Sequence, residues 1–217
     1  MMFEIDRINN YDDKRFSDKI LKQHGAFLIN GNDPYEVEII SKSDAVVRGE
    51  NPVFYDKVIE EFRIYAEHIT NFVDEDNNLI RKYDAVDLFR IPIKEIQPSQ
   101  FYVDIDKKKA VAEFVDSEED VIIPLTKWEE RYASLDGHTR LKVAIDKGFN
   151  YVYGFVTDTG DFINYFIEGA MKRNIYSPYD IVELGHEEYE IKWNRFCEMY
   201  FENQEWLKRK KAYTWKL

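Results

Sequence analysis

The residues best suited to chemistry lie between positions 134 and 141, directly after an apolar run. The segment reads Ser134-Leu135-Asp136-Gly137-His138-Thr139-Arg140-Leu141, so an acid, a glycine, an imidazole, a hydroxyl and a guanidinium occupy successive positions. Glycine lets the backbone approach a ligand closely, and the amides at a helix start favour phosphate, especially beside an arginine. The segment therefore predicts a nucleotide or phosphate site.

Each residue of the motif has an expected role in such a site. The amides of Gly137 and the residues after it would face phosphate oxygens, and Arg140 would neutralise phosphate charge through its planar fork. Thr139 would add a hydroxyl contact or cap the helix. His138 would donate to a phosphate or act as an acid–base catalyst. Asp136 would orient His138, hold Mg²⁺ or activate a hydroxyl. The structural alternative is that Asp-Gly forms a common turn and Thr-Arg begins a helix.

The elements that must position this motif follow from the apolar pattern on either side of it. Within residues 86–157, apolar runs predict strands at 88–93, 121–125 and 151–156. A turn is expected at 96–100, a short helix at 106–115 and a hairpin arm at 128–135. The helix after the motif should stop at Gly148.

The flanking regions complete an expected α+β fold. Residues 1–85 predict an α+β region of unknown role, with strands 26–29 and 37–40 paired through Asn30–Pro34 and a turn at 74–78. One helical face is expected there from Phe54, Val58, Phe62, Tyr65 and Ile69. Residues 158–217 predict helices, with a start at His186 and apolar faces formed by Phe162, Tyr165, Phe166 and Ala170 and by Tyr189, Trp193, Phe196 and Tyr200.

Composition limits the partners and the compartment. The formal net charge is −12, from 30 Lys and Arg against 42 Asp and Glu, and this balance repels nucleic acid unless basic residues cluster. The dense basic run Lys208–Lys211 reads as a solvated helix end, with a nucleic-acid contact as the alternative. The single cysteine, Cys197, excludes an intramolecular disulfide. Without a signal segment or a membrane-spanning apolar run, the chain is expected in the cytoplasm.

The middle region resembles the ParB/sulfiredoxin superfamily. The resemblance rests on Ile91-Pro92-Ile93-Lys94-Glu95-Ile96-Gln97-Pro98-Ser99-Gln100, an apolar strand, and then Leu135-Asp136-Gly137-His138-Thr139-Arg140. It implies a mixed-sheet core in which a Gly-x-x-Arg turn holds nucleotide phosphates at a helix N-terminus. The Asp-Gly-His-Thr-Arg form is similar to that of the archaeal free-serine kinases, which move a phosphate from ADP or ATP to the serine hydroxyl. The implied ligands are ATP or ADP, with CTP as an alternative, and Mg²⁺; Ser99 and Gln100 would contact the substrate.

The other branches of the superfamily match less well. Sulfiredoxin needs a cysteine directly after the motif glycine, where this chain has His138. The DNA-partitioning ParB proteins use Gly-Glu-Arg-Arg to bind CTP and add a helix-turn-helix module. This chain has Gly137-His138-Thr139-Arg140 instead, followed by an acidic C-terminal region without an evident recognition helix.

Two functions from different classes follow. The first is Mg²⁺-dependent phosphoryl transfer from ATP or ADP to a small hydroxyl substrate such as free serine, or nucleotide hydrolysis. In the kinases the matching turn carries a glutamate as base, but here that position is Gln100, an amide that cannot usefully accept a proton. Glu95, Asp104 or Asp106 would have to substitute. The second is a non-catalytic nucleotide-sensing or protein-interaction module. A DNA-binding partition or nuclease protein is disfavoured by the charge, and nothing in the sequence points to a membrane partner.

Overall fold

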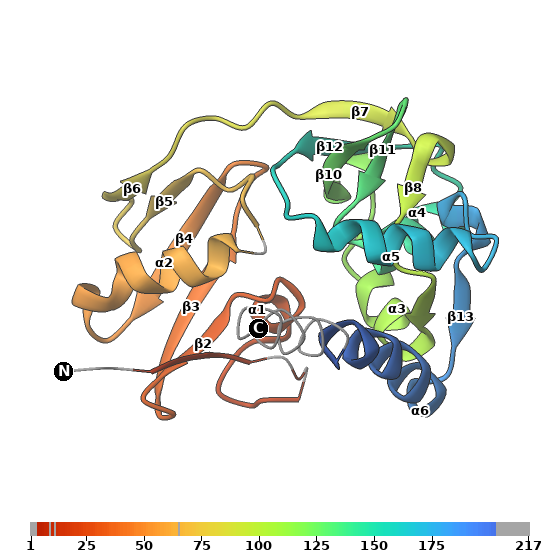
Figure 1. The fold of residues 1–217 in the computed structure, drawn as a ribbon. Helices are drawn as coiled ribbons and strands as arrows, with labels where there is room; N and C mark the ends of the chain where they lie inside the picture. Colours follow the sequence, from red (N-terminus) through yellow and green to blue (C-terminus); the bar gives the residue numbers. More distant parts are fainter. Residues whose placement is uncertain (1–3, 9, 11, 65, 203–217) are drawn as a thin grey trace, which may run out of the picture. The chain divides into compact units, whose positions relative to one another are not determined.

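The chain forms two compact units, Met1–Leu88 and Phe89–Leu217, in the computed structural model, which describes residues 4–8, 10, 12–64 and 66–202 (Figure 1). The fold is α+β with mixed sheets, as the sequence predicts. The boundary lies three residues beyond the expected one at 85, and the second unit contains the rest of the expected region 86–157 together with 158–217. Tyr65 and the basic run Lys208–Lys211 lie outside the described residues.

The first unit is built on a six-stranded sheet whose strands lie side by side in chain order (Figure 1). The strands are β1 (Ile5–Arg7), β2 (Ala26–Ile29), β3 (Asp33–Ile39), β4 (Asp44–Gly49), β5 (Asn71–Val73) and β6 (Leu79–Lys82). Neighbouring strands are antiparallel except β4 and β5, which the 3-10 turn η1 (Pro52–Phe54) and helix α2 (Tyr55–Arg63) connect in parallel. Helix α1 (Asp18–Lys22) precedes β2.

Helix α2 is shorter than its apolar spacing predicts. It ends at Arg63, and Ile69 lies in the following loop, so the expectation of one helical face reaching Ile69 is wrong. The Arg63 guanidinium donates to the carbonyl oxygens of Glu67 and Ile69 at 3.1 and 3.2 Å and so holds this loop. Ile69 is nevertheless buried in the same cluster as Val58 and Phe62. Apolar spacing thus identified the core residues correctly, although the backbone there is not helical.

The second unit has a five-stranded sheet in the order β7-β12-β10-β11-β8 and a separate two-stranded sheet. The strands are β7 (Phe89–Pro92), β8 (Ile96–Pro98), β9 (Tyr102–Asp104), β10 (Ile122–Trp128), β11 (Arg131–Ser134), β12 (Tyr151–Val156) and β13 (Val182–Leu184). The pairs β10–β12, β11–β8 and β13–β9 are parallel, whereas β10–β11 and β12–β7 are antiparallel. The hairpin arm expected at 128–135 corresponds to β11, which pairs with β10 through a tip closed by Trp128 and Arg131.

The helices of the second unit are α3 (Ile105–Ala112), α4 (His138–Asp146), α5 (Phe162–Met171) and α6 (His186–Tyr189), with 3-10 turns η2 (Ile93–Glu95), η3 (Glu118–Asp120) and η4 (Pro178–Asp180). A π-helical turn, η5 (Glu190–Asn194), extends α6, and residues 195–202 are again α-helical. Helix α4 ends just before Gly148, whose φ of +79° suits a helix stop, as predicted. The prediction that residues 158–217 are only helical is wrong at β13, a strand of three residues that forms by pairing with the distant β9.

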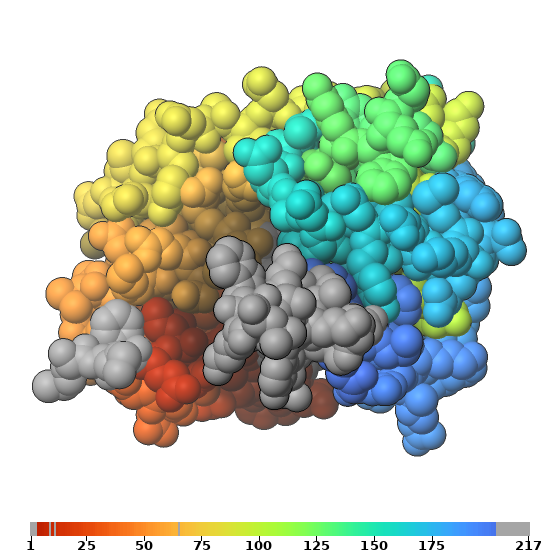
Figure 2. Space-filling view, in the orientation of Figure 1, coloured from red at the N-terminus to blue at the C-terminus, as the bar shows by residue number. Residues whose placement is uncertain are grey.

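Helix α5 covers the face of the second unit that is turned toward the viewer in Figures 1 and 2. Its Ile163 and Ile167 pack against Ala133 of β11, the strand that leads into the motif. The core of the same unit places Leu141 and Val143 of α4 against Ile123 of β10. Packing on both sides therefore fixes where β11 ends and α4 begins. Within the described ranges, no helix is both long and apolar enough to cross a membrane.

Candidate functional site

The motif forms the junction between β11 and α4. Gly137 is the N-cap of α4 with φ +80°, a conformation that other residues adopt only with strain. A Cβ atom at this position would lie 2.6 Å from Cδ1 of Ile123, so any other residue would require the end of that side chain on β10 to shift. As a glycine, this N-cap residue has no side chain that could bond the first amides of α4. The helix therefore begins with amides available to an anion.

His138, the first residue of α4, is 3% exposed and holds the motif to a distant turn. Its Nε2 atom accepts from the backbone amides of Ser99 and Gln100, both at 3.2 Å, and lies 3.0 Å from the Ser134 hydroxyl. Because backbone amides only donate, Nε2 carries no proton, and the neutral ring is protonated at Nδ1. Burial lowers the pKa of His138 to about 4, and the positive charges of Arg140 and Lys107 act in the same direction.

The other ring nitrogen of His138 is unpaired. Nδ1 is buried and has no hydrogen-bond partner among the described residues. A buried N–H without an acceptor is costly, and in a native structure it indicates a partner such as a water, an ion or a ligand. Of the two roles predicted for His138, this geometry favours donation to an anion, because the low pKa and the occupied Nε2 disfavour proton transfer.

Arg140 and Asp136 flank the turn. The Nη1 atom of Arg140 donates to the carbonyl oxygen of Ile122 at 2.9 Å, while its Nη2 atom lies 3.6 Å from Oδ2 of Asp136. Partial desolvation raises the pKa of Asp136, but the Arg140 charge and the Gly137 amide outweigh it and the pKa is lowered. Asp136 is therefore an anion at neutral pH, and its side chain is 63% exposed.

The donor set at this junction fits a phosphate group. It combines the first amides of α4, the buried N–H of His138 and the guanidinium of Arg140. No group of three or more His, Cys, Asp and Glu side chains among the described residues could hold a metal ion by itself. Mg²⁺ is commonly held by one or two carboxylates together with phosphates and water, and the exposed Asp136 fits that part. Thr139 is buried beside them on the second position of α4.

The expected substrate-contact residues, Ser99 and Gln100, lie beside the motif. Ser99 is buried, with its hydroxyl 3.3 Å from Nε2 of His138. The side-chain amide of Gln100 donates to the Tyr102 carbonyl at 2.5 Å and to the Tyr189 hydroxyl at 3.2 Å. Gln100 therefore connects the motif to α6. Burial raises the pKa of Tyr189 to about 12, so its hydroxyl stays protonated.

Sequence reasoning assigned no chemistry to His186, which the structure places against Asp104. The His186 Nδ1 and Asp104 Oδ2 atoms are 2.6 Å apart. Asp104 also caps α3, accepting at Oδ1 from the amides of Asp106 at 2.8 Å and Lys107 at 3.3 Å. The sequence predicts Glu95, Asp104 or Asp106 as the substitute for the glutamate base that is replaced by Gln100. The two partners are separated by 82 positions, so no local spacing signals their contact.

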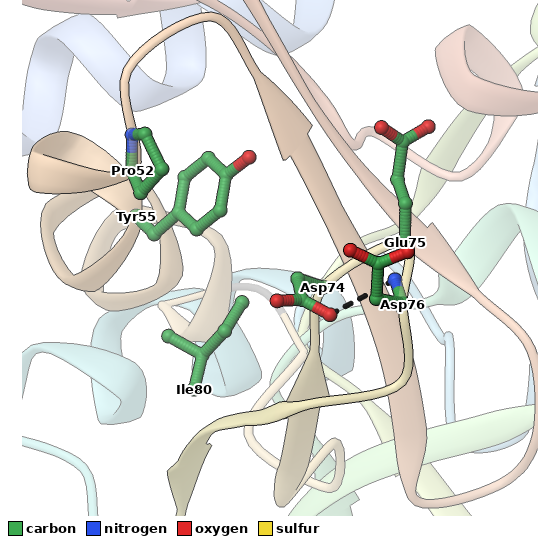
Figure 3. A pocket seen from close by; sticks show the side chains of 6 residues that line it. All are labelled: Pro52, Tyr55, Asp74, Glu75, Asp76 and Ile80. Atoms are coloured by element: carbon green, nitrogen blue, oxygen red, sulfur yellow. Dashed lines mark hydrogen bonds between the residues drawn. The ribbon is translucent and has the colours of Figure 1, made fainter.

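A pocket of about 320 Å³ lies in the first unit and contains none of the motif residues. Pro52, Tyr55 and Ile80 line it together with the acidic Asp74, Glu75 and Asp76 (Figure 3). The Asp74 carboxylate accepts from the backbone amides of Asp76 at 2.9 Å and Asn78 at 2.8 Å. Asp74 thus stabilises the turn between β5 and β6, which the sequence predicts.

Comparisons with known proteins do not indicate which chemistry this chain performs. No family model matches the chain. No curated protein matches it. Among solved structures, protein Atu1540 from Agrobacterium tumefaciens is similar at 17% identity with a TM-score of 0.33, over 45% of this chain and 62% of that one. The match thus spans less than two thirds of that protein. A likeness at this level carries no argument about function.

Proposed function

We propose that this chain binds ATP or ADP at the start of α4 and, with Mg²⁺, transfers a phosphoryl group to a small hydroxyl compound such as free serine. The observation that carries the proposal is the buried, unpaired Nδ1–H of His138 at an uncapped helix start, beside the Arg140 guanidinium. The helix amides and the Nδ1–H of His138 would donate to phosphate oxygens, and Arg140, which also contacts Ile122 and Asp136, would add positive charge. CTP is the alternative nucleotide, and the cytoplasm is the proposed compartment.

The chain's own residues would divide the work as follows. The amides after Gly137 and the Arg140 fork would bind the phosphates, and the exposed, anionic Asp136 lies beside that arginine. Mg²⁺, held by Asp136 and the phosphates, would neutralise charge that builds up on the transferred group. His138 holds the backbone of Ser99 and Gln100 at a fixed place beside α4, from which that turn would contact the acceptor.

A second candidate is nucleotide binding without turnover. Two side chains near the motif are unsuited to act as a base, which favours this candidate. Gln100 is an amide, and the Nε2 atom of His138 already accepts from backbone amides. Such a chain would sense a nucleotide and present its state to a protein partner.

Calorimetric titration with ATP, ADP and CTP, each with Mg²⁺, tests the proposal. Arg140→Ala should weaken binding by about ten- to a hundred-fold, because a charge-assisted hydrogen bond to phosphate is lost. The matched control is Arg90→Ala, which removes an arginine of the same unit that pairs with Glu118. Equal affinity in Arg140→Ala, or no binding of any nucleotide to the unaltered protein, would overturn the phosphate assignment.

A further inference from the structure

The pair formed by Asp104 and His186 combines a buried carboxylate with an exposed imidazole. The side chain of Asp104 is 7% exposed and that of His186 is 62% exposed. One carboxylate oxygen of Asp104 is held by the first amides of α3, so the other is fixed in its direction toward Nδ1 of His186. A ring held at Nδ1 in this way presents Nε2, on its opposite side, away from the carboxylate. This is the arrangement by which a carboxylate orients a histidine base.

This pair lies on the segments that surround the motif. Asp104 and Leu184 are partners at the ends of the parallel strands β9 and β13, and His186 follows two residues after Leu184. Gln100 donates its backbone amide to His138 and its side-chain amide to Tyr189, which is on the same short helix as His186. Lys107, whose amide Asp104 caps, is close enough to affect the pKa values of Asp136 and His138.

In the motif and the adjacent turn, the groups that could take a hydroxyl proton are already engaged or do not ionise. The Nε2 atom of His138 already accepts from two backbone amides, and its Nδ1 atom carries the proton. Gln100 is an amide. The Asp136 carboxylate lies 3.6 Å from the Arg140 guanidinium, which pairs its charge, and the proposed function assigns it to Mg²⁺. Phosphoryl transfer to a hydroxyl is faster when a nearby group takes the hydroxyl proton.

We propose that His186, oriented by Asp104, is the general base that takes the proton from the acceptor hydroxyl. The inference rests on the proposed function and names the proton acceptor of that same site. The hydroxyl oxygen attacks the terminal phosphorus of ATP, and its O–H proton passes to Nε2 of His186. The bond from that phosphorus to the bridging oxygen breaks, and its electron pair leaves with ADP. Nδ1–H remains bonded to Asp104, which stabilises the imidazolium that forms.

The pair also joins α3 to α6, so a structural role has to be separated from a chemical one. His186→Gln retains a side-chain amide able to bond Asp104 but cannot accept a proton. His186→Ala opens space at an exposed position, where added imidazole can enter. The matched control is Glu187→Gln, an exposed neighbour on the same helix.

The experiment measures transfer of the labelled terminal phosphate of ATP to L-serine and to glycerol, beside ATP affinity by calorimetry. We expect His186→Gln to lower the single-turnover rate by about 100-fold or more with unchanged ATP affinity. Added imidazole should restore much of the rate in His186→Ala, and Glu187→Gln should match the unaltered protein.

The possible outcomes distinguish a failure of the His186 assignment from a failure of the proposed function. An unchanged rate in His186→Gln, or no rescue by imidazole, overturns the inference and leaves phosphoryl transfer standing. An unaltered protein that binds ATP but transfers phosphate to neither acceptor also overturns the inference and favours the binding module. If the unaltered protein binds no nucleotide, both proposals fail.

Discussion

The backbone amide of Ser99 donates to the Nε2 atom of His138 at 3.2 Å, across 39 positions of the chain. This bond joins the turn after β8 to the first residue of α4, and it exists only while the imidazole is neutral. The histidine in the middle of a motif that suggests acid–base chemistry is thus a fixed part of the backbone junction. The lone pair of its Nε2 atom is occupied by backbone amides, which disfavours a role for His138 as a general base.

Acid should destabilise the protein through His138. Its pKa is about 4 in the folded chain against an ordinary value of 6.5, so below that ordinary value the unfolded chain binds a proton that the folded chain does not. The stabilisation is complete above pH 6.5 and is lost as the pH falls toward 4, by about 3 kcal/mol. Urea denaturation at a series of pH values measures it.

The matched variant is His138→Gln, whose side-chain oxygen can accept from the same amides but does not titrate. Its free energy of unfolding should depend less on pH over this interval than that of the unaltered protein. Parallel curves for the two proteins would show that His138 is not the titrating group.

Gly137→Ala should destabilise the chain more than Gly148→Ala. Both glycines have nearly the same positive φ, +80° and +79°, so both alanines bear the same backbone strain of about 1 kcal/mol. Only the Cβ at 137 would overlap a neighbour, at 2.6 Å from Ile123, whereas the Cβ at 148 meets nothing within 4 Å. The difference between the two unfolding free energies therefore isolates the packing of the motif on β10. Equal losses would show that this packing is not tight.

Much of the fold could be predicted because it is encoded locally. The apolar run Tyr151–Val156 became β12 with the same bounds, and the helix after the motif stops before Gly148 as its sequence indicates. The strand Val182–Leu184 could not be found in this way, because three residues carry no periodic signal and their conformation depends on pairing with Tyr102–Asp104.

The residues of the candidate site likewise include some that are adjacent in the sequence and some that are brought together only by the fold. Asp136 to Arg140 form one turn and could be grouped from their adjacency alone. The contacts of Gln100 with Tyr189 and of Asp104 with His186 span 89 and 82 positions, and they arise only after β9, α3 and α6 have packed. The sequence therefore groups the residues of the motif but does not indicate which distant side chains pack beside them.

Tyr189→Phe should change acceptor recognition without changing nucleotide affinity. The substitution removes the hydroxyl that accepts from Gln100 at 3.2 Å and leaves the rest of the ring in place. Gln100 then keeps its bond to the Tyr102 carbonyl but loses one of two constraints on its side chain. We expect a higher KM for L-serine and an unchanged Kd for ATP. A change in Kd with no change in KM would place Gln100 on the nucleotide side of the site.

The rate of phosphoryl transfer should rise with pH through the titration of His186. A general base works in its neutral form, and the hydrogen bond to Asp104 raises the pKa of His186, so the rising limb should lie above the ordinary histidine value of 6.5. The charged groups that act on this imidazole are Asp104 from β9, Asp106 from α3 and Glu190 after α6, all acidic. Single-turnover rates measured across neutral pH give the midpoint of this rise in rate.

Asp104→Asn tests the same pair by changing its buried carboxylate. It removes the carboxylate charge while keeping an oxygen that can accept from Nδ1–H, so the midpoint of the rising limb should move to lower pH. His186→Gln should abolish the limb, because no titrating base remains at that position. A limb that keeps its midpoint in Asp104→Asn and persists in His186→Gln would assign the proton to a different acceptor.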